Sequence, residues 1–265
     1  MSQFFTTEIA ESGGLHLITV KSNALGQRVD MSVFVPENAT ASMPVVILLH
    51  GVYGSHWAWS VKGKAHLTAQ RLIQEGQIQP MILTMPSDGL YGDGSGYVPH
   101  RDANFEQWIV EEVPQVLQEQ FSVVTSESPL FISGLSMGGY GALRLGAKYP
   151  QVFQGFSGLS SITQFEQMQQ FVSNFAQLQK DALEQDGVLE WLLKNRAQLP
   201  PFRFDCGSED ILIDANRQLH AALIQQEIAH IYEEFPGGHE WPYWERNLEH
   251  SLKFFNECLK VTQKN

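Results

Sequence analysis

Cysteines, basic residues and long apolar runs are all scarce in this sequence. Its cysteines, Cys206 and Cys258, are too few for a disulfide framework. No apolar run approaches the roughly 18 residues that a membrane-spanning helix requires. The N-terminal segment, MSQFFTTEIAES, has neither a basic region nor the apolar core of a signal peptide. We therefore expect a cytoplasmic protein with no membrane partner.

Positive charge is also in short supply. The chain has 17 Lys and Arg residues against 29 Asp and Glu residues, a formal net charge of −12. This balance argues against nucleic acid as a partner and against a polybasic membrane anchor. Charged residues make up 17% of the chain and apolar residues 43%, which is typical of a folded protein. A single domain over residues 1–265 is expected, and both a monomer and a homo-oligomer stay open.

Several short stretches are typical of β-strands. Leu15–Val20 and Val29–Pro36 are β-rich, and the turn-forming segment Asn23–Gln27 lies between them, so the two strands should pair. The run Val45–Leu49 is apolar without alternation, as expected for a strand buried on both faces. Similar buried runs are Pro80–Met85 and Leu130–Ser133.

Helical periodicity appears between these strands. Ala65 and Leu72 lie on the apolar face of one helix, which Gly76 can close. A second helix should begin after the N-cap residue Asn104, and Pro114 should kink or interrupt it. The alternation of strands and helices predicts an α/β fold with a mostly parallel central sheet and helices on both faces.

Residues 161–200 interrupt this alternation. The stretch is rich in Gln and Glu, and its apolar residues follow a helical spacing at Phe165, Met168, Phe171, Val172 and Phe175. We expect a small helical lid insertion over the carboxyl edge of the sheet. An ordinary pair of packing helices is the alternative.

The strongest chemical signal is Gly-x-Ser-x-Gly at Gly134, Ser136 and Gly138. A buried strand precedes the motif and a helix-forming run follows it, which is the context of a nucleophile on a strained strand-to-helix turn. The helix N-terminus beside Ser136 favours developing negative charge. A glycine-rich turn without chemistry is the alternative, and the flanking elements disfavour it.

A serine hydroxyl is a weak nucleophile and needs a base. His239 lies in a Gly-rich loop, after the β-like run His230–Phe235 and before a final amphipathic helix. It also follows Ser136 in the chain, as expected for this motif. His50 precedes the serine and ends a buried strand, so shaping the oxyanion loop is the role that suits it.

An acid must orient the base. Asp210 lies in the loop beyond the predicted strand Phe202–Cys206, where α/β sites gather. The adjacent Glu209 stays open as an alternative. Asp205 is expected within the strand, and Asp214 is expected to cap the helix that follows it.

Stabilising an oxyanion requires two backbone donors. Met137 N–H, directly after the nucleophile, is the first candidate. The second should come from the loop His50–Gly54, where Val52 is the preferred residue and Tyr53 the alternative.

Four segments together resemble the putative esterase family, which includes esterase D (S-formylglutathione hydrolase), tributyrin esterases, feruloyl and acetyl-xylan esterases, and the antigen 85 mycolyltransferases. They are Leu49–Gly54, Gly134–Leu143, Cys206–Asp210 and Gly237–Trp241, in the family's order. The resemblance implies an α/β-hydrolase fold with Ser136, His239 and Asp210 as the triad, because the family pattern Cys-Gly-x-x-Asp ends on Asp210. It also implies Val52 and Met137 as oxyanion donors.

Within the family, the chain looks most similar to the tributyrin and feruloyl esterase branch. S-formylglutathione hydrolases usually carry Ser-Gly-Leu-Thr-Cys at the oxyanion loop, whereas this chain has His50–Gly54 without a cysteine. We therefore expect a serine carboxylesterase that hydrolyses short-chain acyl or feruloyl/acetyl-type esters through an acyl-enzyme. A glutathione thioesterase and an acyltransferase to a sugar hydroxyl are the alternatives.

The expected partner is a small-molecule ester, and the chemistry needs no metal and no organic cofactor. Tyr53, Trp57 and Trp241 are the expected substrate contacts, and Trp59 is a further candidate; core packing is the alternative for each tryptophan. The glycine- and tyrosine-rich loop Asp88–Tyr97 either lines the pocket or is mobile.

Overall fold

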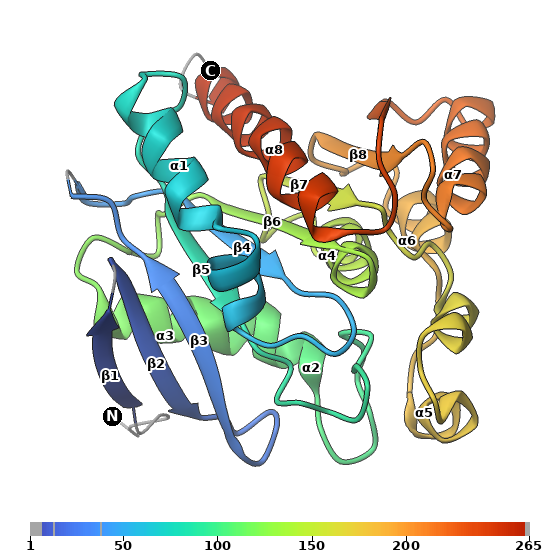
Figure 1. Ribbon diagram of the computed structural model, residues 1–265, viewed down its shortest axis with the longest axis horizontal. Helices are drawn as coiled ribbons and strands as arrows, with labels where there is room; N and C mark the ends of the chain where they lie inside the picture. The colour runs from blue at the N-terminus through green and yellow to red at the C-terminus, as the bar shows by residue number, and fades with distance from the viewer. Residues whose placement is uncertain (1–6, 13, 38, 263–265) are drawn as a thin grey trace.

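A computed structural model describes residues 7–12, 14–37 and 39–262 of the chain. Residues 1–6, which belong to the segment considered for a signal peptide, lie outside this part. Its centre is a nine-stranded sheet in the order β1-β2-β3-β5-β4-β6-β7-β8-β9 (Figure 1). The strands are β1 Thr7–Ser12, β2 Leu15–Lys21, β3 Arg28–Phe34, β4 Val45–Leu49, β5 Ile82–Pro86, β6 Leu130–Leu135, β7 Gly155–Leu159, β8 Phe202–Gly207 and β9 Ile231–Phe235.

The sheet is antiparallel at its N-terminal end and parallel elsewhere. The predicted N-terminal pair is present as β2 and β3, with Leu15 opposite Phe34. From β5 onward through β4, β6, β7, β8 and β9, neighbouring strands are parallel. Parallel strands end at the same edge of a sheet, so the loops after β4, β6, β8 and β9 gather there. The predicted mostly parallel sheet is confirmed.

Helices cover both faces of the sheet. In Figure 1, α1 and α8 lie side by side over one face, while α3 and α4 lie on the other. The helices are η1 Ala58–Lys62, α1 Ala65–Gln74, α2 Phe105–Gln107, η2 Trp108–Glu112, α3 Val113–Gln120, α4 Met137–Lys148, η3 Phe165–Gln170, α5 Phe175–Asp181, α6 Val188–Lys194, α7 Ile213–Gln225 and α8 Trp241–Thr262.

Strand β4 shows why its sequence lacks alternation. Ile47 packs into the core on the α3 and α4 side, and its neighbour Leu48 packs into the core beneath α1 and α8. Successive side chains of a strand point to opposite faces. Both faces are covered, so every position of this strand is apolar and buried.

The expected disturbance at Pro114 is also present. Asn104 caps α2 by accepting a hydrogen bond from the Gln107 N–H at 3.0 Å, as predicted. The next turn, η2, is a π-helix, and Pro114 lies in the first turn of α3 directly after it. Proline lacks an N–H and crowds the preceding turn, which accounts for the wider helical turn at this place.

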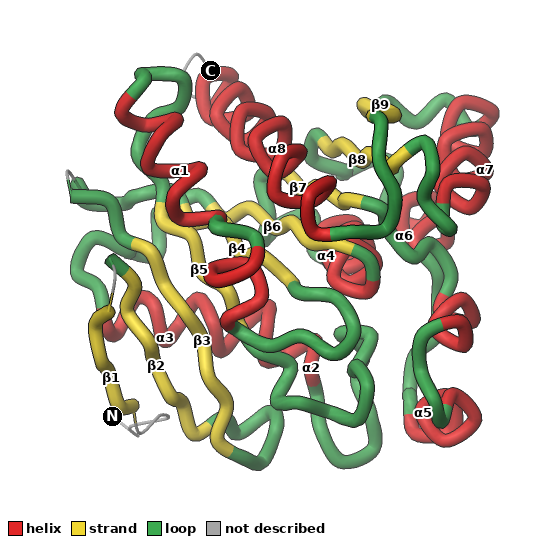
Figure 2. The backbone as a smooth tube through the Cα atoms, in the orientation of Figure 1, coloured by secondary structure: helices red, strands yellow, loops and turns green. Residues whose placement is uncertain are grey.

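The segment between β7 and β8 is helical, as expected, but the helical spacing over residues 165–175 is divided between the short 3₁₀ helix η3 and the start of α5, and α6 follows (Figure 2). α6 packs against α4, while α5 lies farther from the sheet. The sequence pattern did not predict β7, because Gly155–Leu159 reads Gly-Phe-Ser-Gly-Leu and lacks a run of β-branched residues. This strand connects the nucleophile-bearing part of the sheet to the strand that precedes Asp210.

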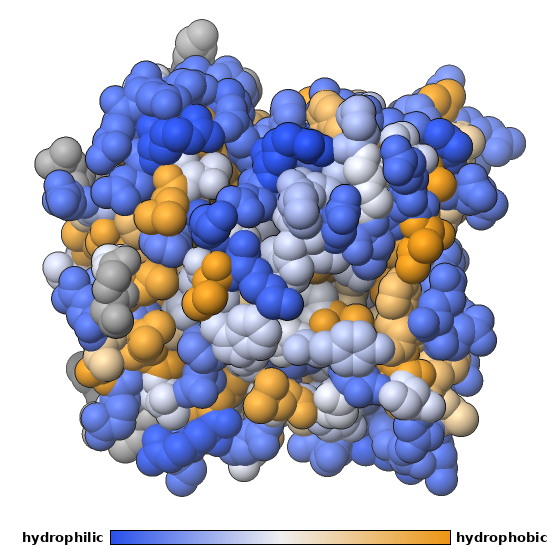
Figure 3. All heavy atoms as spheres, in the orientation of Figure 1, coloured by the Kyte–Doolittle hydropathy of each residue, from blue (hydrophilic) through white to orange (hydrophobic). Residues whose placement is uncertain are grey.

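The visible surface is mainly polar (Figure 3). Figure 3 shows a face that is mostly hydrophilic, with apolar side chains in separate patches among polar ones. No helix in the described part of the chain is long and apolar enough to cross a membrane.

Candidate active site

Ser136 lies on the sharp turn between β6 and α4. Its backbone is at φ 54° and ψ −117°, in the left-handed half of the map that a residue with a side chain rarely adopts. A Cβ atom on Gly138 would lie 2.3 Å from the Leu49 carbonyl oxygen, and one on Gly134 would lie 2.2 Å from the Gly138 carbonyl oxygen. Both positions of the motif therefore require glycine, because backbone atoms occupy the space of a side chain.

The structure brings Ser136, His239 and Asp210 into one hydrogen-bonded row. His239 Nε2 lies 2.9 Å from Ser136 Oγ, and His239 Nδ1 lies 3.0 Å from both carboxylate oxygens of Asp210. An ionised carboxylate only accepts hydrogen bonds, so Nδ1 carries the proton that faces it. Nε2 is then the acceptor for the serine hydroxyl. Residues from the loops after β6, β8 and β9 meet at the carboxyl edge of the sheet.

Asp210 is the carboxylate that faces the imidazole. It is 2% exposed, and its Oδ1 also accepts a hydrogen bond from the Leu212 N–H at 2.8 Å. The neighbouring Glu209 is exposed, and its backbone N–H donates to the Gly237 carbonyl oxygen at 3.0 Å. Within the loop after β8, only the Asp210 side chain reaches His239.

Two other carboxylates near this loop have different positions. Asp205 lies within β8, as expected, where it accepts hydrogen bonds from Arg203 and Tyr243 at 2.7 Å. The prediction that Asp214 caps α7 is wrong: the N-cap is Leu212, and Asp214 lies inside the first turn with its side chain exposed to solvent. The helix starts earlier than expected because Asp210 accepts the Leu212 N–H and fixes the chain there.

The loop after β4 lies against the serine. A Cβ atom on Gly51 would lie 3.4 Å from the Ser136 Cβ. In the described part of the chain, no backbone acceptor takes the N–H of Val52 or of Met137, whereas the Tyr53 N–H donates to the Asp93 carbonyl oxygen at 2.9 Å. Of the two candidates in this loop, the geometry therefore leaves the N–H of Val52 unengaged and that of Tyr53 occupied.

His50 supports the loop from behind. Its Nδ1 donates to the Gly51 carbonyl oxygen at 2.7 Å, and its Nε2 accepts the Asp88 N–H at 3.2 Å. The ring is 2% exposed and makes no hydrogen bond to Ser136. This is the supporting position that the sequence order suggested for His50.

Ser136 and His239 open into a cavity of about 260 Å³. It is lined by Gly51, Val52, Tyr53, Gly54, Trp57, Ala58, Lys62, Leu135, Ser136, Phe171, His239, Trp241 and Trp244. The three expected substrate contacts, Tyr53, Trp57 and Trp241, are all in this lining. Trp59 is not: its ring is buried and its Nε1 donates to the Leu49 carbonyl oxygen at 2.8 Å.

Two aromatic residues of the site were not predicted. The Phe171 ring stacks on the His239 ring, with centroids 5.5 Å apart and an interplanar angle of 26°. The Trp244 ring meets the same imidazole edge-on at 5.0 Å. Trp244 lies one helical turn beyond Trp241, which is a signal that the spacing could have provided. Phe171 comes from the insertion, and nothing local in its sequence points to the base.

The loop 88–97 packs onto the site. The Gly96 N–H points at Met137 Sδ at 3.4 Å, and a Cβ on Gly94 would lie 3.2 Å from Val52 Cγ1. This loop therefore touches both candidate oxyanion residues.

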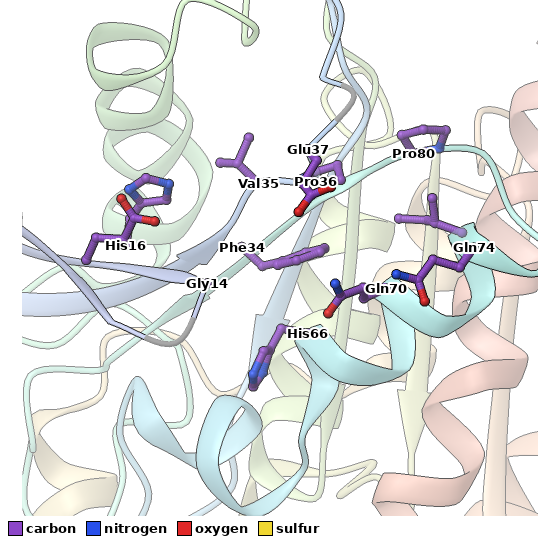
Figure 4. Close-up of a pocket in the computed structure, with 12 residues that line it drawn as sticks. Gly14, His16, Phe34, Val35, Pro36, Glu37, His66, Gln70, Gln74 and Pro80 are labelled. Atoms are coloured by element: carbon purple, nitrogen blue, oxygen red, sulfur yellow. The ribbon is translucent and has the colours of Figure 1, made fainter.

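A separate hollow of about 250 Å³ lies between β2, β3 and α1 (Figure 4). Figure 4 shows Gln70 and Gln74 of α1 near Phe34 of β3, with His66 at one side. This hollow shares no lining residue with the cavity that contains Ser136. In the part of the chain that the structure describes, no group of three His, Cys, Asp or Glu residues is arranged to hold a metal ion.

The fold and the hydrogen-bonded row define a serine hydrolase of the α/β-hydrolase fold. The chain belongs to the family described as Putative esterase, whose model matches residues 22–255. The family resemblance noted from the four sequence segments is thereby confirmed.

Known relatives agree with this assignment. An acetyl esterase of Caldicellulosiruptor saccharolyticus is 24% identical over 82% of this chain and 84% of its own length. The solved structure of a ferulic acid esterase has a TM-score of 0.77 and 23% identity, covering 96% of this chain and 99% of its own. That of an S-formylglutathione hydrolase from Staphylococcus aureus has a TM-score of 0.76 and 17% identity, covering 94% and 98%. At these identities the structures establish the shared α/β-hydrolase fold.

Proposed function

We propose that the protein is a serine carboxylesterase in which Ser136 is the nucleophile, His239 the base and Asp210 the acid. The single observation that carries this proposal is the row from Ser136 Oγ through both ring nitrogens of His239 to Asp210. A hydroxyl becomes an effective nucleophile when an oriented base can take its proton. The row ends inside a cavity with room for an acyl group.

The reaction proceeds in two steps. His239 removes the Ser136 proton as Oγ attacks the ester carbonyl, and Asp210 stabilises the imidazolium that forms. The Val52 and Met137 N–H groups stabilise the oxyanion, and each such donor is worth roughly 3–4 kcal/mol in comparable sites. His239 then protonates the departing alcohol. Water, activated by the same imidazole, attacks the acyl-enzyme and releases the acid.

The cavity supports a small acyl group that is apolar or aromatic. Its walls are mostly apolar and aromatic, which favours contact with acyl chains and aryl rings. Relatives named as an acetyl esterase and a ferulic acid esterase support the same substrate range. The absence of a cysteine from His50–Gly54 disfavours a glutathione thioester, and transfer to a sugar hydroxyl would use the same residues.

A substrate series tests the proposal. The purified protein should show a burst of p-nitrophenol from p-nitrophenyl acetate, followed by slower turnover as the acyl-enzyme is hydrolysed. Hydrolysis of p-nitrophenyl acyl esters and feruloyl-sugars should exceed that of S-formylglutathione. An acylated product in the presence of an added sugar would identify a transferase instead. Absence of both a burst and turnover across the series would contradict a serine esterase.

Four further predictions concern the insertion, the domain organisation, the location in the cell and the oligomeric state. The insertion 161–200 is proposed as a lid, because Phe171 covers His239 from that segment. One domain over residues 1–265, a cytoplasmic location and a choice between monomer and homo-oligomer stay predictions. Cell fractionation and light scattering of the purified protein test the last two.

A further inference from the structure

Tyr53 joins the oxyanion loop to two other parts of the chain. It is a non-glycine residue at φ 61°, a conformation that side-chain-bearing residues adopt only when their surroundings hold them there. Its N–H donates to the Asp93 carbonyl oxygen at 2.9 Å, and its ring hydroxyl donates to the Phe171 carbonyl oxygen. Both bonds are made by the residue that directly follows Val52.

Asp93 links the same two parts from the other side. Its Oδ2 accepts the Ser173 N–H at 2.8 Å and the Ser173 hydroxyl at 2.6 Å. These hydrogen bonds lower the pKa of Asp93 from its usual 3.8, so the carboxylate stays ionised as an acceptor at neutral pH. Tyr53 and Asp93 therefore hold Phe171 and Ser173 of the insertion next to the site.

The part of the insertion that follows α5, around Glu184, is fixed separately. Glu184 forms ion pairs with the buried Arg144 and with Lys148 at 2.6 Å, both on α4. Opening this end would remove a partner from the buried Arg144 guanidinium, which is costly, whereas exposed bonds such as those of Tyr53 open more easily. Closure of the insertion over His239 therefore depends on the contacts that Phe171 and Ser173 make with Tyr53 and Asp93.

From these contacts we infer that Tyr53, Asp93 and Ser173 form a clamp that positions the oxyanion loop only when Phe171 lies over His239. This inference rests on the proposed esterase function. Tyr53 and Asp93 are positioning residues: they act through the Val52 N–H and the His239 ring and do not touch the reacting atoms. The ordering of the oxyanion donor and the covering of the base are thereby one event, so the site is complete only in the closed arrangement.

Conservative variants test the clamp. Tyr53→Phe removes only the hydroxyl that reaches Phe171, and Ser173→Ala removes one donor to Asp93. Each should lower kcat on p-nitrophenyl acetate about three- to tenfold, the effect of one lost hydrogen bond, with KM changed less. Binding of a trifluoromethyl ketone, which forms a tetrahedral adduct that needs the oxyanion donors, should weaken by the same factor. The double variant should lose less than the product of the single losses.

Tyr91→Phe is the matched control, because Tyr91 lies in the loop 88–97 together with Asp93, but its hydroxyl donates to Asp102 at 3.2 Å and not to the insertion. The inference is wrong if Tyr53→Phe behaves like this control, if the ketone binds the variants as it binds the wild type, or if the two losses multiply. If the wild type itself shows no burst and no covalent ketone adduct, the esterase proposal fails and not the clamp alone.

A second, independent feature is the charge of the cavity. Lys62 is the one Lys, Arg, Asp or Glu residue among the residues that line it. Its ammonium lies 5.9 Å from the ring centroids of both Trp57 and Trp241. Among the residues that the structure describes, no carboxylate lies within ion-pair distance of it, whereas the nearby Lys64 is paired with Glu245 at 2.9 Å. In a chain of net charge −12, this leaves one uncompensated cation at the site.

The geometry points to Lys62 as a subsite for a carboxylate carried by the ester substrate, and this too rests on the proposed function. Aromatic faces keep the ammonium at the cavity without neutralising it, so an anion can still pair with it. The carboxylate can belong to the acyl part or to the alcohol part of the ester. Two matched pairs of esters separate these sources.

The pairs are p-nitrophenyl monoadipate with p-nitrophenyl hexanoate, and 4-acetoxybenzoate with its methyl ester. In each pair we compare kcat/KM for the anionic ester with kcat/KM for the neutral ester. In the pair whose carboxylate reaches Lys62, Lys62→Met should lower this ratio about fivefold, the usual upper range for an exposed ion pair. Raising the ionic strength should reduce the wild-type ratio. Unchanged ratios in both pairs would overturn the subsite, while hydrolysis of the neutral esters would still support the esterase.

Discussion

Oδ1 of Asp210 has two hydrogen-bond donors, the His239 ring at 3.0 Å and the Leu212 N–H at 2.8 Å. The same atom thus orients the base and fixes the start of α7. The exposed side chain of Glu209 has no part in this arrangement.

We therefore predict that Asp210→Asn lowers turnover about 10⁴-fold, by favouring the wrong imidazole tautomer. Glu209→Gln is the matched control and should lose far less. Both are measured on one activated ester with circular dichroism as a check of folding. A crippled Glu209→Gln with an active Asp210→Asn would mean that the acid is assigned to the wrong residue.

Trp59 and Trp57 should respond differently to substitution. Trp59→Phe leaves the buried Leu49 carbonyl oxygen without its donor, which costs about 1–3 kcal/mol of unfolding free energy. Trp57→Ala removes a wall of the cavity and should raise KM about three- to tenfold. Thermal melts and steady-state kinetics of both variants check this. A stable Trp59→Phe together with an unaltered KM for Trp57→Ala would reverse the assignment.

The turn that holds Ser136 should not tolerate a side chain at Gly138. In Gly138→Ala the new Cβ would lie 2.3 Å from the Leu49 carbonyl oxygen, and we expect a loss of about 3 kcal/mol or more. Gly155→Ala is a control within the same sheet, where the nearest atoms are 3.3 Å away. Urea unfolding measures both. Equal stabilities of the two variants would contradict this account of the turn.

Both cysteines should be unreactive in the folded protein. Burial raises the pKa of the Cys206 thiol, and burial raises that of Cys258 from 9.0 to about 11. A thiol reagent at pH 8 should therefore label neither until urea unfolds the chain, because the thiolate is the reactive form. A group whose pKa is raised on folding stabilises the folded state fully at pH values below its unfolded pKa. That stabilisation is lost as the pH rises from the unfolded pKa toward the folded pKa. For Cys258 that loss falls between pH 9 and 11. Fast labelling of the native protein would contradict the buried positions.

The hydrogen-bonded row of Ser136, His239 and Asp210 could be predicted from the sequence because each of the three residues follows a strand at one edge of the sheet. Local patterns around Ser136, Asp210 and His239 carry that information. Phe171 could not be predicted, because its contact with His239 depends on how the insertion folds back over the sheet. Asp214 was misassigned because Asp210 accepts the N–H of Leu212 two residues further on, a local turn that lets α7 begin before the expected cap.

The sequence already favoured Val52 over Tyr53 as the oxyanion donor, but the contact that separates the two residues comes from the fold. Val52 and Tyr53 are adjacent in a glycine-containing loop, and both have an N–H. Only the fold places the Asp93 carbonyl oxygen against Tyr53 and leaves Val52 unengaged. Likewise, nothing in the spacing of Trp57 and Trp59 indicates which ring faces the cavity, because that depends on the π-helical turn that contains Trp59.

The central claim is that Ser136 attacks the ester, and turnover of Ser136→Ala on p-nitrophenyl acetate tests it most directly. The variant should fold like the wild type, since only a hydroxyl is removed, and should show no burst. Its turnover should fall on the order of 10⁶-fold, as typically follows loss of a triad nucleophile. A folded Ser136→Ala with near-normal turnover would contradict the account.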